Sequence, residues 1–128
     1  MAYEGAQLTL GTLSAAGDLS TKQYHFVKLA SATTVNVCTA ITDVPIGVLQ
    51  NKPESGETAE ICIFGITKVV ADGTVAFSRW IGTSTDSQAA GITPGSDDTV
   101  YVMGQAITAG AAGTVMTVLL NPTNCRAK

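Results

Sequence analysis

The residues that could carry out chemistry are few in this sequence. His25 is its only histidine, whereas a Ser-His-Asp triad and many metal centres depend on an imidazole. No serine lies in the Gly-x-Ser-x-Gly setting of a nucleophile elbow. We therefore predict that the chain is not an enzyme, and we place His25 on the outer face of an edge or half-exposed strand.

The carboxylates offer little more. Asp97 and Asp98 are adjacent and could offer oxygen ligands to calcium, but no ladder of Asp and Asn residues supports them. Glu54, Glu57 and Glu60 surround a predicted turn, where they suit a solvated face better than acid–base catalysis. We expect no metal ion and no cofactor.

Glycine and cysteine patterns argue against other kinds of site. The glycine-rich segments match neither Gly-x-x-x-x-Gly-Lys-[Ser/Thr] nor Gly-x-Gly-x-x-Gly, so they indicate no phosphate-binding loop. Lys52 lies in a turn, but its neighbours do not form the acidic motif of a lipoyl carrier. Cys38, Cys62 and Cys125 form no Cys-x-x-Cys pair, and we expect Cys62 to be a small core residue.

The chain is poor in charge. Of its 128 residues 45% are hydrophobic and only 13% charged, with a formal net charge of −3. The seven basic residues are scattered, so the basic stripe that nucleic-acid binding needs is missing. No apolar run approaches the roughly 20 residues of a membrane-spanning helix, and no secretory signal is visible. We expect no nucleic-acid or membrane partner, synthesis in a cytoplasm, and a surface suited to being covered by another protein.

The sequence predicts an all-β fold. Alternating apolar residues and frequent glycines indicate a single compact β-barrel or β-sandwich domain of about eight short strands. Gly65 is interpreted as a bulge or bend that lets one long strand serve two sheets. Residues 11–22 and 85–98 are predicted to be loops. The strands are expected near residues 7–10, 23–30, 34–39, 45–50, 59–64, 66–71, 74–77, 79–84, 99–107 and 114–120.

Two aromatic residues have different expected roles. Trp80 is expected to fill the interior of the barrel or sandwich, with a place in an interface as the alternative. Tyr3 stands in an N-terminal segment too short to have a core of its own, so we expect it to dock onto a neighbour.

Two stretches resemble a known family. Residues 45–75, PIGVLQNKPESGETAEICIFGITKVVADGTV, contain a strand with Gly-Val-Leu, a polar turn and a long strand interrupted at Gly65. Residues 104–120 contain Gly-Gln-Ala, a Gly/Ala turn and a closing strand. Both are similar to bacteriophage capsid decoration or cement proteins, which include lambda-like head-decoration proteins and structural cement or head-fibre proteins. The likeness covers a third to a half of the chain and concerns turns and packing.

The resemblance implies a decoration protein on the outside of a phage head. It implies a homotrimer at three-fold or quasi-three-fold positions, with the major capsid protein and its own copies as partners. Residues 1–22 would form an N-terminal arm and residues 23–128 the β-domain. Leu8, Thr9 and Leu10 would add a strand to a partner, and with Tyr3 they are the predicted capsid or subunit contacts. The alternatives are a phage fibre or tail component and a small carbohydrate-binding β-sandwich module.

Overall fold

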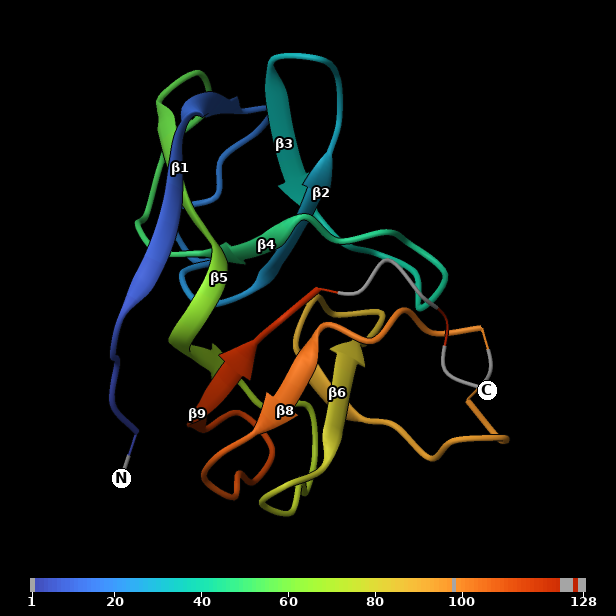
Figure 1. The fold of residues 1–128 in the computed structure, drawn as a ribbon. Coiled ribbons are helices and arrows are strands. Elements are labelled where there is room, and N and C mark those ends of the chain that lie inside the picture. The colour runs from blue at the N-terminus through green and yellow to red at the C-terminus, as the bar shows by residue number, and fades with distance from the viewer. Residues whose placement is uncertain (1, 98, 123–125, 127–128) are drawn as a thin grey trace.

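The computed structural model describes residues 2–97, 99–122 and 126, and these residues form an all-β protein. Within these ranges there are nine strands, and they belong to one continuous sheet (Figure 1). The predicted all-β class is confirmed. The strands are β1 (Gln7–Ala15), β2 (Phe26–Leu29), β3 (Thr34–Val37), β4 (Gly47–Leu49), β5 (Thr58–Val70), β6 (Trp80–Thr83), β7 (Ala89–Gly91), β8 (Gly104–Ala106) and β9 (Val115–Leu120).

The first five strands close into a ring. Their order is β1–β3–β2–β4–β5, and an additional antiparallel pairing of β1 with β5 returns the sheet to its start. Strand β1 also runs parallel to β3, but only at Ser14 and Ala15. We call these strands, with β5 as far as Gly65, the N-terminal ring; it forms the upper half of Figure 1.

The second half of β5 begins the other part of the sheet. It pairs with β9 from Gly65 to Val70, and β8, β6 and β7 follow in that order. A single parallel bridge joins Ala71, just beyond β5, to Ala89 of β7. We call this part the C-terminal sheet. Strand β5 therefore runs unbroken through Gly65 and serves both parts, as the sequence predicted.

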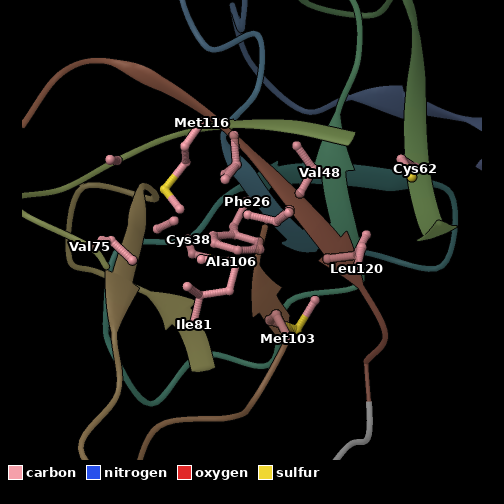
Figure 2. Close-up of a cluster of buried hydrophobic side chains, with 14 residues drawn as sticks. Phe26, Cys38, Val48, Cys62, Val75, Ile81, Met103, Ala106, Met116 and Leu120 are labelled. Atoms are coloured by element: carbon pink, nitrogen blue, oxygen red, sulfur yellow. The ribbon is translucent and has the colours of Figure 1, made fainter. Parts of the chain in front are cut away.

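Strands β2, β4 and β5 lie between two apolar cores, and each of them contributes neighbouring buried residues to both. Neighbouring residues of β2 enter different cores: Phe26 joins the core of the C-terminal sheet, whereas Val27 joins that of the ring. In the same way Cys62 of β5 enters the first core and Ile61 the second. Phe26 lies at the centre of the larger core (Figure 2). Burying a side chain of this size stabilises the fold by roughly 1.5–3 kcal/mol, and the expected core position of Cys62 is confirmed.

Several predicted element boundaries are wrong because distant pairings outweigh local turn signals. Strand β1 does not end near Gly11, since Leu13 and Ser14 find partners at the start of β5. Strand β7 lies within the predicted loop 85–98 because it pairs with β6. Residues 74–77 form no strand beyond one bridge between Val75 and Gly110. Within the described residues, no helix is long and apolar enough to cross a membrane.

Candidate protein-docking surface

The chain exposes several large apolar side chains on its strands. In β1 and β5, Leu8 and Phe64 are paired residues on neighbouring strands, and they are 58% and 52% exposed. Directly opposite residues in an antiparallel pair lie close enough for their side chains to touch. Leu8 and Phe64 therefore form one apolar spot on the β1–β5 ladder.

Strand β1 also has an open hydrogen-bonding edge. One side of it pairs with β5, but within the described part of the chain the other side pairs with a strand only at Ser14 and Ala15. Alternate residues of an antiparallel strand direct their backbone N–H and C=O groups away from the partner. Residues 7–13 carry no charged side chain, although charges and prolines usually protect such an edge from pairing with other chains. Two register shifts against β5 are the protective feature that this edge retains.

The residues before β1 lie across β5 and β9. Tyr3 donates its backbone N–H to Thr117 Oγ1 at 2.6 Å and accepts the hydroxyl proton of Thr117 at its carbonyl, 3.0 Å away. Gly5 N–H donates to the Ile66 carbonyl at 3.0 Å. These contacts attach the exposed residues 3–6 to Ile66 of β5 and to the fully buried Thr117 of β9.

A small charged cluster lies beside this segment. The Glu4 carboxylate lies 3.9 Å from Lys68 Nζ and accepts a hydrogen bond of 2.7 Å from Gln7 Nε2. Lys68 Nζ lies 5.8 Å from the centre of the Tyr24 ring. Partial burial and the neighbouring Glu4 raise the pKa of Tyr24. Because exposed ion pairs are weak, the cluster orients the segment more than it stabilises the fold.

The four predicted contact residues do not lie together at one point. Leu8 and Thr9 are exposed on β1, and Leu10 is half-buried opposite Ile61. Tyr3, 45% exposed, lies instead over β9 of the C-terminal sheet. Whether these residues touch a partner, and whether residues 1–22 act as an arm, stay predictions.

Trp80 is placed differently from the prediction. It is 46% exposed rather than filling the interior, because the smaller Ile81 takes the inward position on β6. Trp80 is paired with Gln105 of β8, which is paired in turn with Leu119 of β9. A hollow of about 380 Å³ opens beside it, lined by Trp80, Val102, Gly104, Gln105, Leu119, Asn121 and Arg126. Sequence reasoning missed this surface, since Trp80 and Leu119 are far apart in the chain.

The prediction for His25 is also wrong. Its side chain is only 7% exposed, because Tyr24 has a positive φ of 66° and β2 begins only at Phe26. His25 therefore lies outside β2, and the alternation of inward and outward residues along a strand does not determine its exposure. Its Nδ1 lies 2.7 Å from Ser87 Oγ, whose own proton is donated to the Asp86 carbonyl. Ser87 is itself only 1% exposed, so its hydroxyl is not open to a substrate; that the chain is not an enzyme stays a prediction.

The remaining acidic candidates have structural partners or lie on the surface. Asp97 Oδ2 accepts the Thr93 backbone N–H at 2.6 Å, while Asp98 lies outside the described residues. Glu57 Oε1 accepts the Glu54 N–H at 2.7 Å, and Glu60 is exposed. Among the residues that the structure describes, no group of three or more His, Cys, Asp or Glu residues could hold a metal ion.

Together these features define a small β-protein with an exposed apolar surface and an open strand edge. No protein-family model matches the chain, and no curated protein matches it. Among solved structures, the N-terminal base of the head fibre protein gp8.5 of bacteriophage phi29 has a similar fold, with a TM-score of 0.67. The match has 13% sequence identity and covers 96% of this chain and 99% of that one. At this identity the likeness shows a common fold over nearly the whole of both chains.

Proposed function

We propose that this chain is a structural protein of a bacteriophage head. In this proposal it decorates and stabilises the outer surface of the shell as a cement protein. The observation that supports the head location is the nearly end-to-end fold match to the base of a phage head fibre, while the cement role is drawn from the sequence resemblance. The resemblance to decoration proteins was found from the sequence and falls on β4, β5, β8 and β9. These strands come from both parts of the sheet.

Attachment to the major capsid protein would use the open edge of β1. An extended capsid segment could pair with the free backbone groups of residues 7–13, while the apolar spot of Leu8 and Phe64 contacts its side chains. Strand addition of this kind draws affinity from main-chain hydrogen bonds and specificity from alternate side chains. The exposure of Leu8 supports this role, because nothing within the described residues covers more than about half of it.

A charge-introducing pair of variants tests the contact. Leu8→Lys places an ammonium group in the proposed interface, whereas Leu29→Lys makes the same change at a similarly exposed residue, 53% against 58%. Both lysines remain solvated in the free protein, so both variants keep the stability of the parent. We expect Leu8→Lys to weaken binding at least about tenfold, since losing a buried leucine contact costs roughly 1.5–3 kcal/mol.

The measurement is cosedimentation with purified heads of the phage that encodes the chain. Equal binding of the two variants would contradict the β1 contact while leaving a head location open. No binding of the parent protein to expanded or unexpanded heads would contradict the decoration role itself. Deleting residues 2–20 would not test the contact cleanly, because it removes β1, which closes the ring, and so could unfold the protein.

The copy number and position distinguish the proposed trimer from the second candidate, a fibre base. The fold match to a head-fibre base favours that candidate specifically. Native mass measurement gives the oligomeric state, and we expect a trimer. In images of intact heads, density over many three-fold or quasi-three-fold positions supports cement, whereas density continuing outward into a thin projection supports a fibre.

A further inference from the structure

His25 lies where the N-terminal ring meets the C-terminal sheet. It comes directly before Phe26, the first residue of β2 in the ring. Its imidazole reaches Ser87, in the turn between β6 and β7 of the C-terminal sheet, with 2.7 Å between Nδ1 and Ser87 Oγ. A backbone hydrogen bond of 2.7 Å from Phe26 N–H to the Ser87 carbonyl joins the same two segments. The buried histidine is thus part of a junction between the two halves of the protein.

The hydrogen bonds assign the proton on the imidazole. Ser87 Oγ donates to the Asp86 carbonyl, so it can only accept from His25. The same carbonyl lies 3.3 Å from Nδ1 and is also an acceptor. Nδ1 therefore carries the proton, and Nε2 holds a free lone pair. Protonation would add a proton at Nε2 and spread a positive charge over the ring, while Nδ1–H keeps its two acceptors.

The surroundings of His25 oppose that charge. The ring borders a hollow of about 290 Å³ whose charged lining residues are Lys22 and Asp86. Burial is the main cause that lowers the pKa of His25, and Lys22 adds to it, while the carbonyl and carboxylate of Asp86 act in the opposite direction. The third titratable group there, the Cys38 thiol, stays neutral because burial raises its pKa to about 12.

Loosening this junction would affect more than one hydrogen bond. Ser87 has a positive φ of 60°, a conformation that a serine keeps only when its surroundings hold it. Ser87 itself is 1% exposed, and Phe26 lies in the core of the C-terminal sheet. A charge on His25 is therefore buried beside a strained turn and a core aromatic residue.

We propose that His25 makes the junction acid-sensitive: the neutral imidazole is buried between the two halves of the protein at neutral pH, and protonation favours opening of the junction because the charged ring is costly to bury there. The direction follows from linkage. Because the unfolded chain takes up the proton near pH 6.5 and the folded chain only at lower pH, stability is full above about 6.5 and falls as the pH decreases below it. The equilibrium constant for opening rises up to about tenfold for each unit by which folding lowers the pKa.

The single histidine makes the test direct. We expect NMR titration of the imidazole C–H resonances in the folded protein to give a midpoint below 6.5, and His25→Asn to remove the loss of stability between pH 7.5 and 5. Asparagine retains a donor near the position of Nδ1 but does not titrate, so it preserves the bond to Ser87 Oγ. Lys22→Gln should raise the NMR midpoint without removing it, which a purely structural role of Lys22 would not do.

Amide hydrogen exchange locates the change. After correction for intrinsic rates, the Phe26 amide should lose protection at pH 5 in the parent and keep it in His25→Asn. A midpoint at or above 6.5 would overturn the proposal, and this result needs no variant to fold. An unchanged acid response in His25→Asn would overturn it as well.

Discussion

Replacing Gly65 by alanine tests how the two halves share β5. Gly65 has a positive φ of 118°, and a Cβ there would lie 2.8 Å from Gln7 Cα and closer still to the Ala6 carbonyl oxygen. Both obstacles belong to the backbone, which cannot rotate away as a flexible side chain could. The methyl group must therefore push the segment before β1 off β5.

Gly73 supplies a matched control. Its φ of 104° is similarly unfavourable for alanine, but a Cβ there would meet nothing within 4 Å. The control variant carries only the conformational cost, about 1–3 kcal/mol. Gly65→Ala carries that cost and also strains two hydrogen bonds, from Ile66 N–H to the Ala6 carbonyl and from Gly5 N–H to the Ile66 carbonyl.

The difference between the two variants isolates the backbone contact. At about 1 kcal/mol for each hydrogen bond, Gly65→Ala should destabilise the protein by about 2 kcal/mol more than Gly73→Ala. For a domain of this size that corresponds to a Tm lower by roughly 6–12 °C. Thermal unfolding followed by circular dichroism gives both values. Equal Tm values for the two variants would refute the reasoning that the close approach of Ala6 makes Gly65 necessary.

Three further predictions concern the buried contacts. Thr117→Val keeps the shape of the side chain but leaves the Tyr3 N–H without its acceptor. We expect the free energy of unfolding, measured in denaturant, to fall by about 1–2 kcal/mol and an aminopeptidase to remove residues 2–5 faster. The control variant Thr9→Val should change neither. Burial alone would raise the pKa of Asp43, but hydrogen bonds from Lys28, Thr39 and Ala40 lower it overall. The ionised Asp43 should therefore stabilise the fold above about pH 4 and cease to do so below it. Asp43→Asn should reduce the pH dependence of the free energy of unfolding between pH 5 and 2.5. In a Cys125→Ser variant, Cys38 and Cys62 should resist a thiol reagent in the native protein, because both are buried and burial raises the pKa of both thiols. Both should react once guanidinium has unfolded the protein. Rapid labelling of the native protein would contradict their burial.

Local sequence patterns were sufficient to predict the strands in the middle of the chain. Residues 45–75 predicted β4, the following turn and the long β5, because the apolar residues of β5 alternate with polar or exposed ones and polar residues separate the two strands. Gly65 could be recognised as a special position, since a glycine inside an apolar strand usually marks a bulge or a close approach of backbone.

The candidate surface was only partly predictable. Leu8 was named from the sequence as a candidate contact and is exposed in the structure, although whether it touches a partner stays a prediction. The exposure of Trp80 does not follow from the sequence, because a large aromatic residue is usually mostly buried and only the inward position of Ile81 turns Trp80 outward. Phe64 falls in the strand predicted near residues 59–64, but its pairing with Leu8 appears only when β1 meets β5.

The sequence by itself determined the β class, the absence of extensive charge and the glycine on which β5 bends, since these depend on residue type and short-range alternation. Only the tertiary structure decided that β1 closes a ring, that β7 forms within a polar stretch, and that His25 lies buried against Ser87. The physical reason is common to all three. Each depends on hydrogen bonds or burial between residues far apart in the chain, and their energies outweigh the local preferences that the sequence displays.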